Sequence, residues 1–244
     1  MQIRWLLPIF IIAGLFTGCS QYSSTEDKRN SVSNIETTYP NPDPEISALL
    51  ESYRDSLDTV MGQKIATVHD TLRFSKPESP LGNLVADALR YRAGSELKEF
   101  VHLGIIGASS FGLYLTPGEL TLHEVMEFMP YENHLVILKM RGSKVFELAN
   151  QIAEMGGAPV SGIRFRIEDG EARGVLVNSQ ILDHSTEYMV ATSSWAANGG
   201  DRFPALWDYN DRIDLYDVNV RDLYTDYFKS RQDIYPNLDG RIRF

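Results

Sequence analysis

The stretch WAANGGDRFP, residues 195–204, places two glycines and an aspartate directly before an aromatic side chain. Glycine tolerates backbone angles that other residues avoid, so Gly199 and Gly200 can form a loop that turns the Phe203 ring outward. A ring held in this way offers its face to a ligand. The alternative is that residues 198–201 form a plain turn and that Phe203 packs into the core.

Residue types that perform nucleophilic, acid–base or metal chemistry are not grouped in this sequence. No two of the five histidines stand at a spacing that aims both imidazoles at one metal: His69, His102, His123, His134 and His184. The segment IIGASSFG, residues 105–112, comes nearest to a phosphate-binding glycine loop, but it lacks the required lysine. No His-Asp-Asn cluster typical of a two-metal phosphatase centre occurs. We therefore assign no catalytic residue and no metal ligand to this chain.

Composition limits the class of partner. The chain has 244 residues, 43% of them hydrophobic, so it is long enough and apolar enough to bury a core. Its formal net charge is −10 at pH 7 and its pI is about 5.0. A surface with this charge repels phosphate backbones, which argues against general nucleic-acid binding.

The first 18 residues have the pattern of a secretion signal. Arg4 precedes an apolar stretch, residues 5–16, that is too short to span a membrane and is followed by small residues. The segment FTGC resembles a bacterial lipobox, which implies that Cys19, the only cysteine, is lipidated. The alternative is an ordinary cleaved signal with an incidental cysteine. A lipidated Cys19 would anchor the protein to a membrane of the bacterial cell envelope, on the periplasmic side or at the outer membrane.

Residues 19–44 are polar and serine-rich and end in a proline run, so we expect a disordered tether there. One folded domain is then expected over residues 45–244, with helices and strands interleaved in a mixed α/β (α+β) fold. Hydrophobic periodicity predicts helices at 45–60, 80–91, 120–129, 143–155 and 220–231. It predicts strands at 62–74, 100–108, 134–142 and 186–194, and a hairpin over 161–178 that turns near Asp169 and Gly170. Ser143 is the expected cap of the fourth helix, and Asn83 fits a helix start.

Four separated stretches occur in an order that resembles the C-terminal domain of the 5'-nucleotidase family. They are ESPLGNLVADALR (78–90), GELTLHEVMEFMPYENHLVILKMRGSKV (118–145), VSGIRFRI (160–167) and ANGGDRFP (197–204), and the closing IYPNLDGRIRF is also similar. The resemblance covers about residues 60–244. It implies a domain that binds the base and ribose of a nucleotide, while the family's two metals and His-Asp dyad belong to an N-terminal metallophosphatase domain.

The resemblance assigns site residues by matching positions. The family loop N-G-G-D-G-[FY] corresponds to Asn198, Gly199, Gly200, Asp201 and Phe203, with Arg202 in place of the usual glycine. Its aromatic is implied to stack on the nucleobase, an interaction worth about 1–3 kcal/mol. Ser109, Ser110, Phe111 and Tyr114 either line a pocket adapted to a less anionic ligand or only pack their loop.

Several positions depart from the family pattern. Where the family has N-G-G-G-I-R, this chain has GASSFG, so the asparagine position is Gly107 and the arginine position is Gly112. A further family arginine falls on Ser75 or Pro77, with Arg73 nearby but out of register, and a second stacking aromatic falls near Gly157. Each lost guanidinium contact to an anion removes about 1.5–3 kcal/mol of binding energy.

Two function classes follow from these expectations. In the first, the chain is the nucleotide-binding half of a split nucleotide hydrolase, and a separate metallophosphatase supplies the divalent metals and the chemistry. In the second, it is an envelope lipoprotein that binds a nucleoside or other small ligand without catalysis, or a scaffold that has lost its ligand. The sequence predicts no cofactor in this chain itself.

Overall fold

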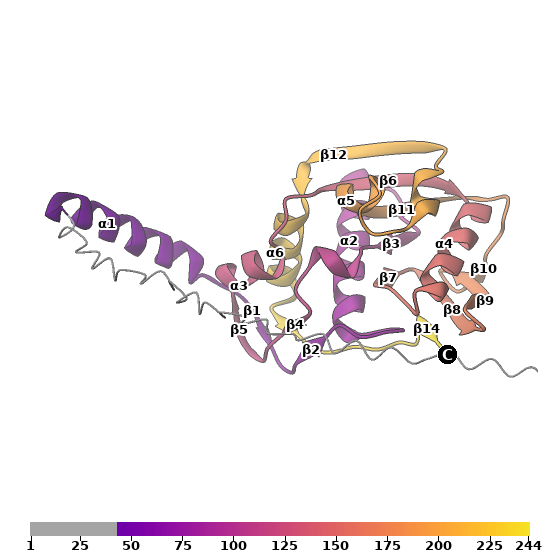
Figure 1. Cartoon of the computed structure of the whole chain (residues 1–244), viewed down its shortest axis with the longest axis horizontal. Helices are drawn as coiled ribbons and strands as arrows, with labels where there is room; N and C mark the ends of the chain where they lie inside the picture. The colour runs from indigo at the N-terminus through magenta and orange to yellow at the C-terminus, as the bar shows by residue number, and fades with distance from the viewer. Residues whose placement is uncertain (1–42) are drawn as a thin grey trace, which may run out of the picture. The chain divides into compact units, whose positions relative to one another are not determined.

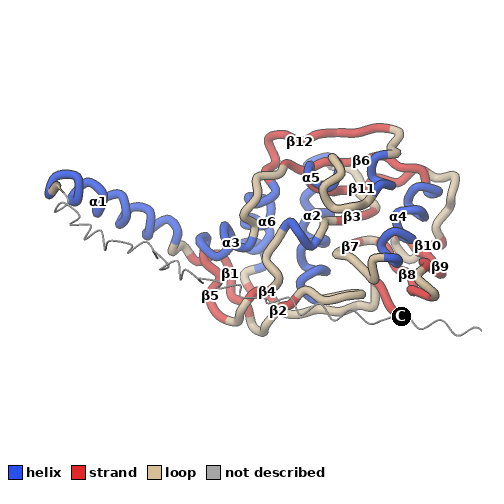
Figure 2. The backbone as a smooth tube through the Cα atoms, in the orientation of Figure 1, coloured by secondary structure: helices blue, strands red, loops and turns tan. Residues whose placement is uncertain are grey.

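The computed structural model describes residues 43–244 (Figures 1 and 2). The predicted signal segment 1–18, the predicted lipidation site at Cys19 and residues 20–42 of the predicted tether lie outside the described residues. Residues 50–244 form one compact unit, which holds every element after helix α1. Across residues 43–244, no helix combines the length and hydropathy that a membrane crossing requires.

Six α-helices and two short 3₁₀ helices occur in the described part of the chain. The α-helices are α1 (Pro44–Met61), α2 (Pro80–Leu97), α3 (Leu122–Phe128), α4 (Gly142–Glu154), α5 (Ser194–Ala197) and α6 (Val220–Arg231), and the 3₁₀ helices are η1 (Ala108–Ser110) and η2 (Pro204–Trp207).

The strands, red in Figure 2, form four sheets. The five-stranded sheet has the order β12 (Asp211–Asn219), β6 (His134–Arg141), β11 (Glu187–Ser193), β3 (Leu103–Ile105) and β7 (Val160–Ser161). The four-stranded sheet is β10 (Gln180–Ile181), β9 (Glu171–Val177), β8 (Ile163–Glu168) and β14 (Ile242–Arg243). The small sheets are β13 (Asp233–Ile234) with β1 (Lys64–Val68) and β5 (Gly118–Thr121), and β2 (Leu72–Arg73) with β4 (Tyr114–Leu115).

The central strand β6 explains why two hydrophobic cores form. Successive side chains of a strand point to opposite faces of the sheet. Leu135 and Ile137 therefore join a cluster with α2, α3 and α6, which we call the α2–α6 cluster. Val136 and Leu138 join a second cluster, with α4, β8 and β9. Because both faces are covered, the strand is a continuous apolar run rather than an alternating one.

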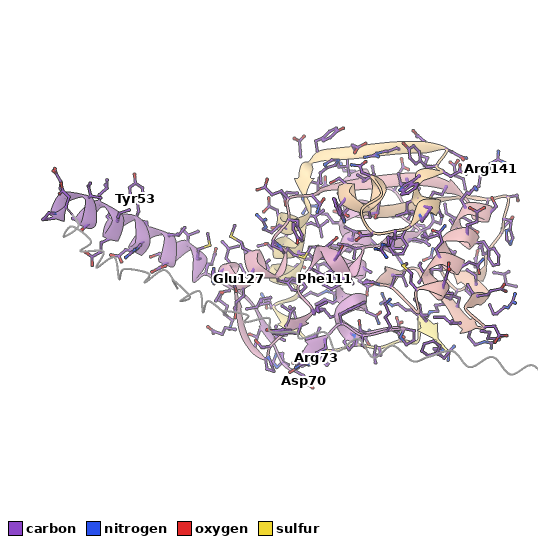
Figure 3. All side chains as sticks on the ribbon, in the orientation of Figure 1. Tyr53, Asp70, Arg73, Phe111, Glu127 and Arg141 are labelled. Carbon is purple, nitrogen blue, oxygen red and sulfur yellow. The ribbon has the colours of Figure 1, made fainter. Side chains whose placement is uncertain are left out.

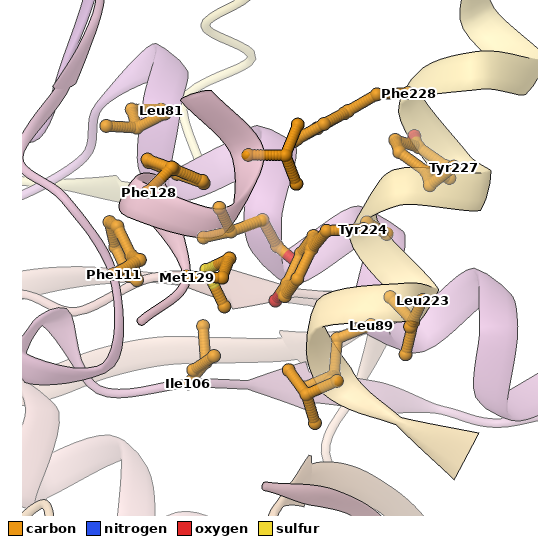
Figure 4. Packing of buried hydrophobic residues seen from close by; sticks show 14 of the residues in the cluster. Leu81, Leu89, Ile106, Phe111, Phe128, Met129, Leu223, Tyr224, Tyr227 and Phe228 are labelled. Atoms are coloured by element: carbon orange, nitrogen blue, oxygen red, sulfur yellow. The ribbon is translucent and has the colours of Figure 1, made fainter. Parts of the chain in front are cut away.

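The first of these clusters is rich in aromatic side chains (Figure 4). Tyr224 and Phe228 of α6 point toward α2, and the Tyr224 hydroxyl donates a hydrogen bond of 3.0 Å to the Val85 carbonyl. Burial raises the pKa of the Tyr224 phenol, so this hydroxyl stays protonated. Phe111 packs edge-on against Phe74 in the same cluster, with ring centroids 6.0 Å apart.

Most predicted elements are present, and the differences have local causes. Helix α4 begins at Gly142, one residue before the predicted start, so Ser143 lies inside the first turn and is not the cap. The backbone N–H groups of Gly142 and Ser143 instead donate to the carbonyls of Thr186 and His184. Helix α2 is capped by Ser79, whose Oγ accepts from Gly82 N–H at 3.1 Å, rather than by Asn83.

Helix α1 forms where the periodicity predicts it, yet none of its side chains is buried. Tyr53, labelled in Figure 3, is one of its exposed apolar residues. Strand β12 has no counterpart in the predictions. Its signal is the pair Ile213 and Leu215, which pack from one face of the strand onto the α2–α6 cluster.

Candidate functional site

The loop 198–203 contacts residues 107–109, which are far away in the sequence, and the residues just before the loop, Ser194 and Trp195, contact Asn133. Trp195 stands in the short helix α5 at the entrance to this loop, and 52% of its surface is exposed. Tyr131 precedes β6 and is 60% exposed. Aromatic side chains of this size usually bury most of their surface in a fold, so two exposed rings at one place indicate a surface kept for a ligand.

Trp195 and Tyr131 line one pocket of about 370 Å³, which we call the aromatic pocket. Its other lining residues are polar: Ser109, Ser110, Glu132 and Asn133. Ser110 is 3% exposed, and its Oγ has no hydrogen-bond partner among the described residues. A buried hydroxyl without a partner is costly, so a ligand that bonded to it would gain binding energy at this point.

Asn133 joins the two aromatic segments. Its Oδ1 accepts hydrogen bonds from the Ser194 hydroxyl at 3.1 Å and from the Trp195 backbone N–H at 3.2 Å. The Ser194 hydroxyl in turn accepts from the His134 backbone N–H at 3.2 Å. The position of Trp195 relative to Tyr131 is thus fixed by bonds between the start of β6 and the start of α5.

Gly200 supports the Trp195 indole from the loop side. A Cβ at position 200 would lie 2.0–2.2 Å from three atoms of the indole, so only glycine fits there. The φ angle of Gly200 is not positive, so the requirement is one of space and not of backbone conformation. The glycine that the sequence predicts to make the loop pliable therefore serves to let an aromatic ring pack closely on the backbone.

Asp201 links the loop to residues 107–109. Its Oδ1 accepts from the Ser109 hydroxyl at 2.6 Å, and its Oδ2 accepts from the Gly107 backbone N–H at 3.2 Å. A Cβ at position 107 would overlap the Asp201 carboxyl group, so the absence of a side chain there makes this approach possible. Ser109, Gly200 and Asp201 therefore lie at one place, and their predicted role in substrate binding stays a prediction.

Phe203 does not turn outward. Its ring is 2% exposed and packs in the cluster formed with α4 and the four-stranded sheet, which corrects the expected outward orientation. The residue does line a smaller cavity of about 200 Å³, together with Lys76, Asp201 and Arg202. A contact between Phe203 and a ligand stays a prediction, but the exposed aromatic faces belong to Trp195 and Tyr131.

Asn198 holds the start of the loop through strand β12. Its Oδ1 accepts from Arg212 Nη1 at 2.9 Å, and Arg212 also makes two hydrogen bonds of 2.8 Å to the Asp214 carboxylate. Asp214 Oδ1 lies 2.7 Å from His134 Nε2. Hydrogen bonding to Arg212, with a smaller effect from His134, lowers the pKa of Asp214 against the opposing effect of burial.

Two further residues that the sequence suggests for the site, Phe111 and Tyr114, lie outside the aromatic pocket. Phe111 is buried in the α2–α6 cluster, and Tyr114 is exposed but lines neither the aromatic pocket nor the Phe203 cavity. Arg73, marked in Figure 3, places its guanidinium over the Tyr114 ring, 5.7 Å from the centroid. Arg73 lines neither the aromatic pocket nor the Phe203 cavity, whereas Arg202 lies on the wall of the Phe203 cavity.

Within residues 43–244, no group of three or more histidine, cysteine, aspartate or glutamate side chains is arranged to hold a metal ion. The residues present thus do not fit the two-metal centre that the family's other domain carries. What this site offers chemically is an aromatic, partly polar surface for binding a flat ligand.

The sequence alone indicates the loop but not Trp195, Tyr131 or Asn133. A signal for Trp195 was present, because it stands only three residues before Asn198 in the same quoted stretch. No local pattern identifies Tyr131 and Asn133, since they reach Trp195 only through the pairing of β6 with β11.

The sequence matches the family described as 5'-nucleotidase, C-terminal domain, over residues 60–208. This match covers more than half of the chain, and the chain belongs to that family. The family resemblance found from the sequence and the mixed α/β fold class are both confirmed.

Individual relatives are distant and much longer. The chain is 24% identical over 227 residues to the trifunctional nucleotide phosphoesterase protein YfkN of Bacillus subtilis, which covers 82% of this chain and 15% of that protein. It is 22% identical over 179 residues to the 5'-nucleotidase of Vibrio cholerae, covering 71% of this chain and 31% of the relative. The chain thus spans less than a third of the length of these curated relatives.

Solved structures give the same result for the fold. The 5'-nucleotidase precursor from Thermus thermophilus aligns with a TM-score of 0.68 and 25% identity, covering 81% of this chain and 42% of that one. The NAD nucleotidase of Haemophilus influenzae aligns with a TM-score of 0.62 and 20% identity, covering 82% of this chain and 41% of that one. At its identity, the second likeness concerns the fold alone.

Proposed function

We propose that this domain binds a nucleoside or nucleotide and holds its base in the aromatic pocket. The observation that carries the proposal is that Trp195 and Tyr131, both more than half exposed, line one pocket. Stacking of a base on an aromatic side chain contributes about 1–3 kcal/mol and tolerates different bases. Ser110 and Asn133 lie in the same pocket and offer polar groups to the edge of the base.

We propose further that the domain is the nucleotide-binding half of a split nucleotide hydrolase in nucleotide catabolism. A relative is named a 5'-nucleotidase, and no group of three or more potential metal ligands occurs among residues 43–244. A separate metallophosphatase would supply the divalent metals and attack the phosphate with metal-activated water. A chain of this kind is inactive alone and contributes affinity for the base.

A second candidate function has its own observation. The lining of the aromatic pocket contains no lysine or arginine and includes Glu132. A pocket with this charge favours an uncharged nucleoside over its phosphate, as expected of a binding protein without catalysis. If no ligand of either kind binds, the remaining function is that of a scaffold.

We propose that the protein acts at the bacterial cell envelope, anchored by a lipid on Cys19. Replacement of Cys19 by serine removes the only cysteine, and the variant is expected to leave the membrane fraction of its host. A Cys19→Ser protein that stays in the membrane fraction would refute the lipid anchor and leave the binding proposal untouched.

Calorimetric titration with adenosine and with AMP tests the binding proposal. Wild-type protein is compared with Tyr131→Ala and Trp195→Ala, and Tyr114→Ala is the matched control because Tyr114 is exposed to a similar extent outside the pocket. We expect saturable binding that both pocket variants weaken and the control retains. Equal binding by all four proteins, or no binding by wild type, rejects the aromatic pocket as the site.

The ratio of the affinity for AMP to the affinity for adenosine distinguishes the split hydrolase from the nucleoside-binding protein. Stronger binding of AMP favours the split hydrolase, which is then tested by mixing the protein with a purified metallophosphatase that lacks its own C-terminal domain. Association and raised phosphatase activity are the expected results. Adenosine binding at least as tight as AMP binding, with no association, favours the nucleoside-binding protein.

A further inference from the structure

Another cavity, of about 250 Å³, shares no lining residue with the aromatic pocket or with the Phe203 cavity. It lies where α2 and the β7–β8 segment meet the C-terminal segment, and we call it the arginine cavity. Its charged lining residues are three arginines and two aspartates: Arg90, Arg164, Arg241, Asp87 and Asp239. The cationic side chains therefore exceed the anionic ones by one.

The Arg241 side chain has two carboxylate partners and a carbonyl partner within the fold. Its guanidinium forms a double contact with the Asp87 carboxylate, at 2.9 and 2.6 Å, and donates to Asp239 at 3.0 Å and to the Val160 carbonyl at 2.8 Å. A buried arginine with two carboxylate partners and a carbonyl partner has a structural role. Arg164 also uses Asp239, donating to its backbone carbonyl at 2.7 Å and lying 3.3 Å from its carboxylate.

Arg90 is the arginine that remains without a carboxylate. Its recorded hydrogen bond is a long one, 3.4 Å to the Ser161 hydroxyl, and that hydroxyl already donates to Asp87 at 2.6 Å. Among residues 43–244, no carboxylate oxygen lies within 4.0 Å of the Arg90 guanidinium. A partly buried cation in this situation lacks the compensation that folds normally provide.

Two electrostatic effects agree with this geometry. Burial lowers the pKa of Arg90, and the opposing effect of Asp87 is partly offset by Arg241. Burial also lowers the pKa of His102, and the charge of Arg90 lowers it further. The attraction of Asp87 therefore offsets the effect of burial on Arg90 only in part.

We propose that the arginine cavity is a second ligand site, which binds a small oxyanion such as phosphate through Arg90 and Arg164. A water molecule takes about 30 Å³ of liquid volume, so the cavity has room for an oxyanion with several waters. Ser161 and Asn178 add polar groups to the same lining. The bound anion pairs with Arg90, which has no carboxylate partner among residues 43–244. Anion binding is independent of the aromatic pocket because the two share no lining residue.

Inorganic phosphate is the probe, added to the full chain at constant ionic strength set by chloride. We expect calorimetry to show saturable binding and thermal unfolding to show a Tm that rises with phosphate concentration. Arg90→Gln is expected to weaken phosphate binding at least tenfold and to remove the Tm rise, whereas Arg90→Lys keeps part of both. Arg166→Gln is the matched control, since Arg166 stands on the same strand as Arg164 but does not line the cavity.

The outcomes separate this proposal from the one about nucleosides. Trp195→Ala should leave phosphate binding unchanged, and Arg90→Gln should leave adenosine binding unchanged. Should Arg90→Gln not fold, NMR of the wild-type protein decides instead, with phosphate expected to shift amide signals of Ser161 and Asn178 but not of Trp195. Absence of phosphate binding by wild type, or equal binding by Arg90→Gln, overturns the proposal.

Discussion

Replacement of Gly200 by alanine tests the aromatic pocket without touching a ligand-facing group. The added Cβ would lie 2.0 Å from an indole atom of Trp195, while an ordinary contact begins at 3.4 Å. The ring or the loop must therefore move by about 1.4 Å. Because Gly200 does not have a positive φ, alanine introduces no backbone strain, and the whole effect is steric.

The expected loss follows from what the displaced ring contributes. Stacking on one aromatic is worth about 1–3 kcal/mol, which corresponds to a factor of about 5 to 150 in affinity. A displacement of about 1.4 Å either removes the contact between the Trp195 ring and the base or narrows the aromatic pocket. We expect Gly200→Ala to weaken adenosine binding by about tenfold or more and to lower the free energy of unfolding by about 1–3 kcal/mol, as for other overpacked sites.

Calorimetric titration with adenosine, together with urea unfolding, measures both effects in a double-mutant cycle with Trp195→Ala. If the indole is the group that the new methyl displaces, alanine at 200 should cost little once Trp195 has been truncated. Adenosine binding by Gly200→Ala at wild-type affinity would refute the reasoning. So would additive effects in the double variant, since they would mean that the methyl acts on something other than the indole.

Three further predictions concern residues that hold the loop. Arg202 has a φ of 61° where the family has glycine, so Arg202→Gly should raise the free energy of unfolding by about 1 kcal/mol in urea titrations. Asn133→Ala removes the acceptor of two hydrogen bonds and should weaken adenosine binding about tenfold by freeing Trp195, as calorimetry would show. Because the pKa of Asp214 is lowered, its ion pair with Arg212 stabilises the fold above the ordinary value of 3.8 and is lost as pH falls below it. Asp214→Asn should therefore unfold at a lower Tm than wild type at pH 7, and melting curves should converge toward pH 3.

Local sequence patterns predict an element correctly where residues adjacent in the sequence determine its geometry. The 163–177 hairpin was predicted from its turn residues, and Asp169 and Gly170 indeed have the positive φ angles, 53° and 79°, that such a turn requires. The apolar run in β6 predicted a strand because it is short and rich in branched residues. In both cases neighbours in sequence decide the structure.

Where the structure differs from the predictions, the cause is contact with residues that are distant in the sequence. Phe203 is drawn into the core because η2 packs on α4, where the Gln151 side chain accepts from the Ala205 backbone N–H at 3.1 Å. Trp195 becomes the exposed aromatic because Asn133, 62 residues earlier, holds its backbone. The glycines and the aspartate do form a loop, but which aromatic ring is exposed beside it depends on contacts that no local pattern contains.

The departure from the family pattern at Gly107 changes the surroundings of Asp201, a residue that matches the pattern. The Asp201 carboxylate occupies the space that a side chain at 107 would need, and it bonds there to the Gly107 N–H and to Ser109. An asparagine at 107, as the family pattern has, would force Asp201 out of this position. A polar ligand group that approaches Asp201 must in turn compete with a 2.6 Å bond from Ser109, which reduces the net gain. Affinity at this site therefore depends mainly on Trp195 and Tyr131, so it should vary with the flatness of the ligand more than with its charge.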